Sequence, residues 1–262
     1  MIIDFHVHIF PDEIANKAIS TLAEKCKVPP ETNGTAEDTL SKMKEWGIDK
    51  AVCLNIATKP TQQRKINSFM VETASDKFIP FGTFHPQSET ALEEISFIKS
   101  SGIKGIKLHP DYQNFYINEK QCFPYYSLME ELNLPLIVHS GYDVGIGCPI
   151  RCTPYMLSQV AKAFPRLKII AAHFGGNGLW HDAADLLGDL DNVYFDTAFP
   201  CNLDSQTAKM VVRKKGAERV LFGSDCPWSS PRKIIDLIDS IDLSAEEKDL
   251  IFQKNAINLL SL

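Results

Sequence analysis

The segment Ile2-Ile3-Asp4-Phe5-His6-Val7-His8-Ile9 opens the chain as an apolar, β-branched run that carries two histidines. Runs of this length and composition are typical of β-strands. Successive side chains alternate between the two faces of a strand, so His6 and His8 are predicted to share one face. The same alternation places Asp4 on that face, one step deeper. The opening strand therefore presents two imidazoles side by side.

Seven further apolar runs of strand length follow along the 262 residues. They cover residues 50–56, 78–85, 103–109, 134–139, 167–173, 193–197 and 220–225. Amphipathic stretches with helical spacing lie between and after them, for example at residues 40–46, 91–103, 156–164 and 242–262. Strict alternation predicts parallel strands with right-handed crossovers, and eight such units close a barrel of about 250 residues. We therefore predict an α/β fold, a single-domain (β/α)8 TIM barrel with outer helices, over residues 1–262.

The composition narrows the class of partner. The net charge is -6 and the isoelectric point is near 5.7, which argues against a general nucleic-acid partner because such proteins usually present a basic surface. The sequence has no apolar run long enough to span a membrane and no signal-peptide or lipidation motif. We expect a cytoplasmic protein without a membrane partner, acting on a small molecule.

The histidines fall at defined places. Six of the seven follow or end predicted strands, and the eighth strand ends in an aspartate; these residues are His6, His8, His85, His109, His139, His173 and Asp225. The carboxyl ends of barrel strands ring one mouth, where the active sites of this fold lie. Imidazole combined with carboxylate suits Zn²⁺, Fe²⁺ or Mn²⁺. The pattern predicts a metal site that is nucleated by His6 and His8.

The order of these residues resembles the amidohydrolase superfamily, and most closely its amidohydrolase 2 branch of single-metal hydrolases, lactonases and non-oxidative decarboxylases. The flanking motifs that carry the resemblance are Asp4-Phe5-His6-Val7-His8, Gly105-Ile106-Lys107-Leu108-His109-Pro110, Ala172-His173-Phe174-Gly175-Gly176 and Gly223-Ser224-Asp225-Cys226-Pro227. The resemblance covers essentially the whole chain. It implies one divalent metal, with Zn²⁺ preferred over Mn²⁺ or Fe²⁺, bound by His6, His8, His139 and Asp225. It also implies His173 as a catalytic residue and a homodimer as the assembly.

The chemistry of such a site favours hydrolysis. A bound metal lowers the pKa of water from about 15.7 to about 7 and polarises a carbonyl group. Asp225 could take the proton of the water and pass it to the leaving group, and His173 could hydrogen-bond the substrate oxygen. We therefore expect a metal-dependent hydrolase of a small-molecule amide, lactone or ester.

Three other functions stay open. A non-oxidative decarboxylase of a small carboxylic acid would use the same ligands, so the sequence barely separates it from a hydrolase. A TatD-type phosphodiesterase resembles a different pattern, with a glutamate ending the fourth strand where this chain has Lys107 and His109. A non-enzymatic binding protein on the same barrel is the fourth hypothesis.

Further residues are candidates for contacts with substrate or ligands. Lys107 and His109 point to the barrel mouth; we favour a charged lysine that binds a substrate carboxylate. In other branches of the superfamily a carboxylated lysine near this place bridges two metals, so a two-metal site stays open. After strands four, five and eight, the predicted substrate contacts are Tyr112, Arg151 and Trp228. His85 and Asp4 are predicted to orient metal ligands.

Overall fold

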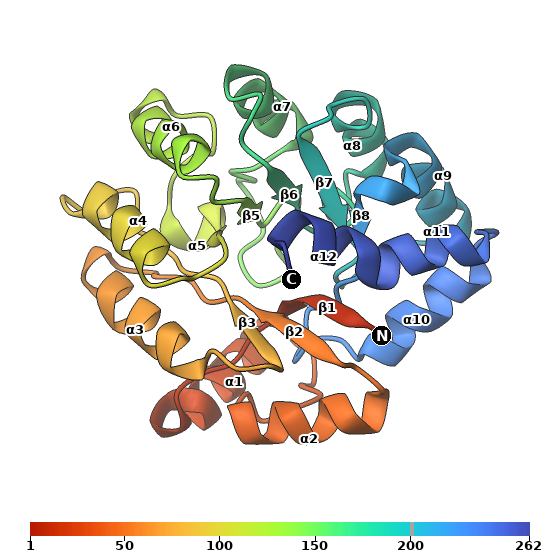
Figure 1. The fold of residues 1–262 in the computed structure, drawn as a ribbon, viewed down its shortest axis with the longest axis horizontal. Coiled ribbons are helices and arrows are strands. Elements are labelled where there is room, and N and C mark those ends of the chain that lie inside the picture. The colour runs from red at the N-terminus through yellow and green to blue at the C-terminus, as the bar shows by residue number, and fades with distance from the viewer. Residues whose placement is uncertain (200–201) are drawn as a thin grey trace.

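In the computed structural model, which describes residues 1–199 and 202–262, the strands form a ring that is surrounded by helices (Figure 1). The strands are β1 (Ile3–Val7), β2 (Lys50–Cys53), β3 (Phe78–Pro80), β4 (Ile106–Leu108), β5 (Leu136–Val138), β6 (Ile169–Ala171), β7 (Val193–Asp196) and β8 (Val220–Leu221). They pair in parallel, in the orders β1-β2-β3 and β4-β5-β6-β7-β8. Parallel bridges from Gly82 to Ile106 and from Val7 to Cys226 join the two sheets into a closed barrel. The predicted (β/α)8 barrel is confirmed.

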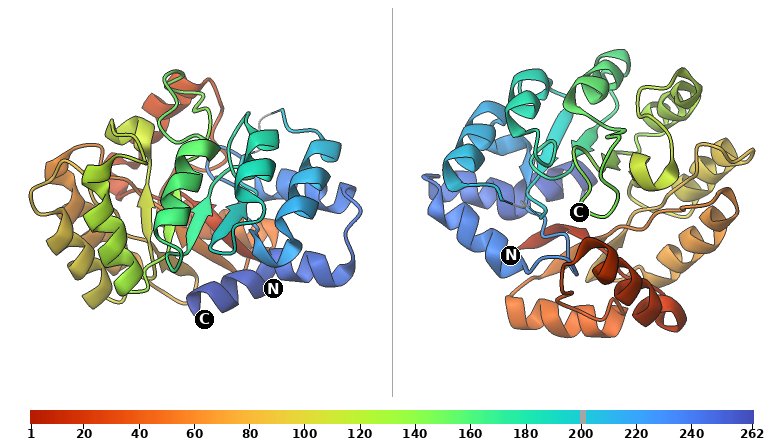
Figure 2. Two further views of the ribbon diagram at one scale, coloured as in Figure 1. Left: turned by 90° about the horizontal axis from the view of Figure 1, so that it is seen from above. Right: turned by 180° about the vertical axis from the view of Figure 1, so that it is seen from behind.

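The helices surround this ring, except that the last one lies across one of its ends (Figures 1 and 2). They are α1 (Asp12–Cys26), α2 (Ala36–Trp46), α3 (Gln63–Thr73), α4 (Ala91–Ser100), α5 (Pro110–Gln113), α6 (Phe123–Glu131), α7 (Pro154–Ala163), α8 (Trp180–Leu187), α9 (Ser205–Lys215), α10 (Pro231–Ser240), α11 (Ala245–Asp249) and α12 (Asn255–Leu260). Short 3-10 turns lie at Pro60–Gln62, Lys120–Cys122 and Ala217–Arg219, and a π-helical turn at Leu250–Lys254 joins the last two helices. Side-chain caps fix several starts: Thr35, Thr153 and Ser244 each accept a hydrogen bond from a backbone N–H of the first turn.

The apolar core has two layers. The inner layer fills the barrel with one side chain or two from most strands, such as Phe5, Leu54 and Ile137, and it includes Ala256 and Leu260 of α12. Figure 1 shows α12 lying across the centre of the strand ring, at the end of the barrel where the N-terminus lies. The outer layer packs the other strand faces against the surrounding helices. Because α12 closes the amino end of the barrel, the carboxyl ends of the strands form the other mouth.

A β-bulge in β1 changes which side chains face inward. Asp4 pairs with Ala51, but Val7 pairs with Cys53, so β1 contains one residue more than β2 between these pairs. Ala51, Cys53 and Val7 belong to the outer layer of the core. Asp4 therefore faces outward, and the prediction that it shares a face with His6 is wrong because the bulge interrupts the alternation.

None of the helices formed by residues 1–199 and 202–262 combines the length and the apolar character that crossing a membrane requires.

Candidate metal centre

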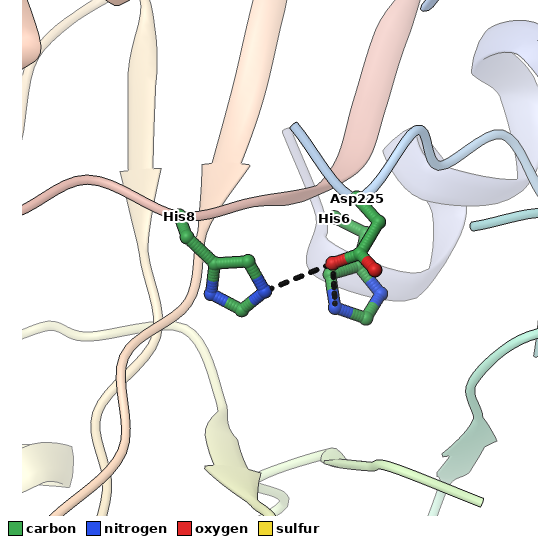
Figure 3. A group of neighbouring side chains, drawn as sticks. All are labelled: His6, His8 and Asp225. Atoms are coloured by element: carbon green, nitrogen blue, oxygen red, sulfur yellow. Dashed lines mark hydrogen bonds and ion pairs between the residues drawn. The ribbon is translucent and has the colours of Figure 1, made fainter. Parts of the chain in front are cut away.

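Three of the predicted ligands meet at the mouth of the barrel, where β1 and β8 lie side by side. The Nε2 atoms of His6 and His8 lie 3.4 and 3.0 Å from the same Oδ1 atom of Asp225. Figure 3 shows both rings directed at this carboxylate. His6 and Asp225 are buried, whereas His8 is partly exposed at the mouth. The bulge in β1 contributes to this arrangement, because it turns His6 inward after Asp4 has pointed outward.

Hydrogen bonds on the far side of each ring fix which nitrogen faces the centre. Nδ1 of His6 donates to Oδ2 of Asp196 at 2.8 Å, and Nδ1 of His8 donates to the carbonyl oxygen of Leu54 at 2.7 Å. In the neutral rings, both Nε2 atoms then carry a lone pair and face the carboxylate of Asp225, which is also an acceptor. The amine of Lys107 lies 3.2 Å from Nε2 of His6, but Nε2 of His8 and Oδ1 of Asp225, 3.0 Å apart, still face each other as two acceptors. The donor set of two imidazoles and one carboxylate fits a divalent metal ion.

The ionisation of these groups agrees with ligation. Burial, and next the charge of Lys107, hold the pKa of His6 well below its usual value, which keeps the ring neutral. Burial acts to raise the pKa of Asp225, but the imidazoles of His6 and His8 that face the carboxylate outweigh burial, and the pKa is lowered. Neutral imidazole and ionised carboxylate are the forms that bind metals.

The backbone at the mouth is strained where the predicted catalytic residues lie. Asp225 and His173 have φ angles of 68° and 63°, and Phe174 follows at 54°. Left-handed φ is uncommon for residues other than glycine, and such strain gathers at functional sites. Gly223 allows β8 to approach β1, because a Cβ there would lie 3.0 Å from Cβ of His6.

Asp4 connects the main chains that carry the ligands. Its carboxylate accepts hydrogen bonds from the backbone N–H groups of His6 and Ser224 at 3.1 and 2.9 Å, and from the Ser224 hydroxyl at 2.5 Å. The predicted role of orienting a ligand imidazole therefore belongs to Asp196. Sequence analysis missed this because Asp196 ends β7, six strands further along the chain than β1, which carries His6.

His139 is not brought into the first group. Nδ1 of His139 lies 2.9 Å from Nε2 of His173. On the other side of the His173 ring, Nδ1 lies 3.0 Å from the carbonyl oxygen of Ala198. Nε2 of His139 belongs instead to a second group, with Nε2 of His109 and a carboxylate oxygen of Asp143. The prediction of His139 as a fourth ligand of the first metal thus lacks the geometric support that the other three ligands have. Asp143 was not predicted; its only sequence signal is its place in the loop after strand five.

Lys107 lies at the centre of the mouth. Its side chain is 1% exposed, and its Nζ lies 3.2 Å from Nε2 of His6. Burial lowers its pKa to about 8, although Asp196 and Asp225 counteract this shift. The predicted position of Lys107 beside the metal ligands is therefore observed.

The three loop residues predicted to contact substrate make contacts within the protein. The guanidinium of Arg151 donates to Oδ1 of Asn114 at 2.9 Å, and its backbone N–H donates to Asp111. Tyr112 packs edge-on against His109, with ring centroids 4.6 Å apart. Trp228 follows the ligand Asp225 and donates its backbone N–H to the carbonyl oxygen of that residue.

His85 lies in a turn after β3. Its Nδ1 accepts the N–H of Gln87 at 3.2 Å, and its own backbone N–H donates to Gln63. The predicted contact with a metal ligand is not among these hydrogen bonds. Its buried ring is explained by this local turn.

Comparison with known proteins identifies a family and several solved structures with the same fold. The family model described as amidohydrolase matches residues 3–262. A dihydroxybenzoic acid decarboxylase from a Polaromonas species, solved with manganese and the inhibitor 2-nitroresorcinol, superposes with a TM-score of 0.76 at 19% identity, covering 100% of this chain and 97% of that one. Its likeness to this chain establishes the fold.

Two further solved structures share the fold. The 5-carboxyvanillate decarboxylase of Novosphingobium aromaticivorans, also solved with manganese, gives a TM-score of 0.77 at 18% identity, covering 100% of this chain and 96% of that one. The 4-oxalomesaconate hydratase of Rhodopseudomonas palustris gives a TM-score of 0.69 at 22% identity, covering 100% of this chain and 96% of that one. With the family model matching nearly every residue, this chain belongs to the amidohydrolase family, in its amidohydrolase 2 branch.

Proposed function

We propose that the chain is a metal-dependent, non-oxidative decarboxylase of a small carboxylic acid, in place of the hydrolase that we expected first. The observation that carries the proposal is Lys107, a buried amine 3.2 Å from Nε2 of His6. Hydrolysis of a neutral amide or lactone has no need of a buried cation beside the metal ligands. A carboxylate substrate does, because its charge must be neutralised when it leaves water.

The similar proteins support the same choice. Two of the solved neighbours are named as decarboxylases of aromatic carboxylates, and both were solved with manganese. Manganese is therefore a second candidate for the ion beside the Zn²⁺ that the sequence favoured. The hydratase among the neighbours also acts, by its name, on a carboxylate compound. A carboxylate substrate is common to all three names.

We assign the metal to His6, His8 and Asp225. When bound, the ion supplies Lewis-acid polarisation of a substrate oxygen. Asp196 and the carbonyl of Leu54 hold the two imidazoles in the tautomer that binds. Lys107 pairs with the carboxylate of the substrate. A substrate bound in this way would have its scissile carbon–carbon bond positioned next to the side chains that transfer protons.

The reaction requires one proton at one carbon. The bond between the carboxyl carbon and its neighbour breaks, carbon dioxide leaves, and the bonding electron pair stays on the neighbouring carbon, which takes up a proton. No oxidant or reductant is consumed. Asp225, when protonated, and His173 are the groups at the mouth that can deliver this proton. Both residues have left-handed backbone, the kind of strain that gathers at functional sites.

Product analysis tests the proposal. The protein, loaded with Mn²⁺ or Zn²⁺, would be incubated with hydroxybenzoates and enoic acids, and in parallel with lactones, cyclic amides and esters. We expect release of carbon dioxide from at least one acid, abolished by chelation and by Asp225→Asn. Turnover of a lactone, amide or ester without carbon dioxide would instead establish the hydrolase, and Asp185→Asn on the exposed face of α8 controls for the lost charge.

A further inference from the structure

We propose that α1 is the moving half of a cover over the barrel mouth, and that its last turn separates from the β5 loop (residues 141–152) to admit a substrate. Two helices connect β1 to β2; α2 lies in the outer ring, and α1 is additional. The left view of Figure 2 shows α1 (red) and the β5 loop (green) at the end of the barrel opposite both termini. The inference concerns access to the mouth and holds for whichever reaction takes place there.

The side chains that we assign to substrate and metal lie beneath this cover. Lys107, His173 and Asp225 are 1%, 4% and 7% exposed. His8, in the segment that leads into α1, is partly exposed and marks the edge of the mouth. Since even water reaches almost none of the Lys107 side chain, a carboxylate can reach this amine only if part of the protein moves.

One contact joins the two halves of the cover. Cys26, the last residue of α1, faces Gly145 of the β5 loop and the hydroxyl of Tyr112. A Cβ on Gly145 would lie 2.9 Å from the sulfur and 3.0 Å from the hydroxyl oxygen. Lys25 lies over the Tyr112 ring, 4.8 Å from its centroid, and this ring packs edge-on against His109. The end of α1 is thus connected through Tyr112 to the interior of the mouth.

The charges around Cys26 place its thiol above the mouth. Burial, and next the charge of Asp143, raise the pKa of this thiol, and the carboxylate of Asp225 acts in the same direction. The effect of a charge falls with distance. Both carboxylates are therefore close to the thiol, although they come from loops on different sides of the barrel.

α1 is held weakly by the rest of the protein. Its buried residues are Ala15 and Ile19, out of fifteen. Apart from the contacts with Tyr112, no hydrogen bond or ion pair joins α1 to another element in the parts of the chain that the structure describes. Segments with few buried contacts open at low cost, and lids are drawn from such segments.

The β5 loop is held more firmly. The N–H of Tyr142 donates to the carbonyl oxygen of Asn177 at 2.9 Å, and the amide of Asn177 donates back to the carbonyl oxygen of Tyr142 at 2.8 Å. The N–H of Gly145 donates to the carboxylate of Asp143 at 2.9 Å, and that of Gly147 to its carbonyl oxygen at 2.8 Å. The loop is therefore the fixed half of the cover, and α1 is the half that moves.

A disulfide bond can fasten the two halves together. In a disulfide, the Cβ of one cysteine lies about 3 Å from the sulfur of the other. The Cβ position of Gly145 is 2.9 Å from the sulfur of Cys26, and the φ angle of Gly145 is not in the left-handed region. Gly145→Cys is therefore expected to form this bond in oxidised glutathione. The chain would also carry Cys148→Ser, which removes the exposed thiol of the same loop.

Access to the mouth is measured at Lys107. Trinitrobenzenesulfonate, an anionic aromatic reagent, modifies accessible amines, and peptide mass spectrometry follows the modification of Lys107 with time. We expect slow modification in the wild type, none in the disulfide-linked variant, and modification again after reduction with dithiothreitol. Lys162, exposed on α7, should react at the same rate in every sample.

Gly145→Ser is the matched control, because it adds a side chain of similar size that cannot form the bond. It should behave as the reduced Gly145→Cys chain does. Equal modification of Lys107 with and without the disulfide would overturn the inference, because access would then not require α1 to move. Failure of the disulfide to form, or a Lys107 that stays unmodified in the reduced chain, would also contradict it. No step requires turnover, so failure of the decarboxylase proposal would be recognised separately.

Discussion

At the scale of single residues, Asp196 connects the candidate metal ligand His6 to the backbone that carries His173. Its Oδ2 accepts Nδ1–H of His6 at 2.8 Å, and its Oδ1 accepts the N–H groups of His173 and Ala198 at 2.7 and 3.1 Å. Both oxygens are therefore committed to donors. A carboxylate that holds a ligand imidazole in this way fixes its tautomer and raises its basicity.

Asp196→Asn is expected to weaken metal binding without unfolding the chain. The amide oxygen can keep the two backbone N–H groups, but the amide NH₂ must then face Nδ1 of His6. That contact favours the tautomer with the proton on Nε2, which cannot bind a metal. We expect the dissociation constant for Mn²⁺ at the metal centre to rise roughly 10- to 100-fold. Isothermal titration calorimetry measures it, with Asp185→Asn as control; an unchanged constant would contradict the orienting role.

Lys107 provides a second prediction at this scale. A buried amine beside His6 that pairs with substrate should matter for binding, so Lys107→Met is expected to raise KM for the carboxylate substrate. A charged hydrogen bond contributes about 1.5–3 kcal/mol, which corresponds to roughly a 10- to 150-fold increase. The Mn²⁺ content should stay that of the wild type. Loss of an ion in Lys107→Met would instead indicate the carboxylated lysine.

The sequence predicted which candidate ligands lie together better than it predicted the residues that hold them in place. His6, His8 and Asp225 were predicted to meet because histidine and aspartate at strand ends point to one mouth. Asp196 also ends a strand, yet nothing in its own neighbourhood shows that it contacts His6, because that contact depends on how the barrel closes. Asp143 lies in a loop, whose path no periodicity predicts.

At the scale of elements, the bulge in β1 explains why alternation failed. The register of a strand is set by its pairing, and the sequence of β1 alternates without interruption, so no residue marks the extra position. Asp4 was therefore assigned to the wrong face. Helices were easier to predict, since apolar side chains at helical spacing, as in residues 40–46 and 156–164, define them locally.

The carboxyl end of α8 is held by one side chain of the next helix, Lys215. Lys215 of α9 is 3% exposed, and its Nζ donates to the carbonyl oxygens of Leu187, Gly188 and Leu190 at 3.0, 3.1 and 2.9 Å. The last carbonyl groups of a helix have no partner within the helix. Lys215 supplies partners for them and joins the two neighbouring helices.

Lys215→Met is expected to destabilise the protein by about 3 kcal/mol, because three carbonyl oxygens lose a charged donor in a buried position. Urea denaturation, followed by circular dichroism, measures the free energy of unfolding. Lys214→Met is a matched control, since Lys214 is adjacent and pairs with the exposed Asp189. Its cost should stay below about 1 kcal/mol. Equal effects in the two variants would show that Lys215 has no special role.

At the scale of the whole molecule, closure of the barrel brings the three candidate metal ligands together. The first and last strands meet through three backbone hydrogen bonds, from Phe5 to Phe222, from His8 to Cys226 and from Asp225 to His6. The ligands lie on these same segments, so an ion held by His6, His8 and Asp225 would tie the first strand to the last. These segments are far apart in sequence, which is why the sequence could predict a ring of eight units but not the backbone hydrogen bonds that close it.

Metal binding should therefore protect the β1–β8 junction from local opening. Any opening that separates His6 and His8 from Asp225 must release the ion, so at a free Mn²⁺ concentration 100 times the dissociation constant such opening costs about 2.7 kcal/mol more and exchange slows about 100-fold. Hydrogen-exchange mass spectrometry should show this protection in residues 3–9 and 222–226, and much less in β2 and β3. His8→Ala, which lacks a ligand, should gain no protection. Equal protection in that variant, or protection spread evenly over the barrel, would mean that the metal does not close the junction.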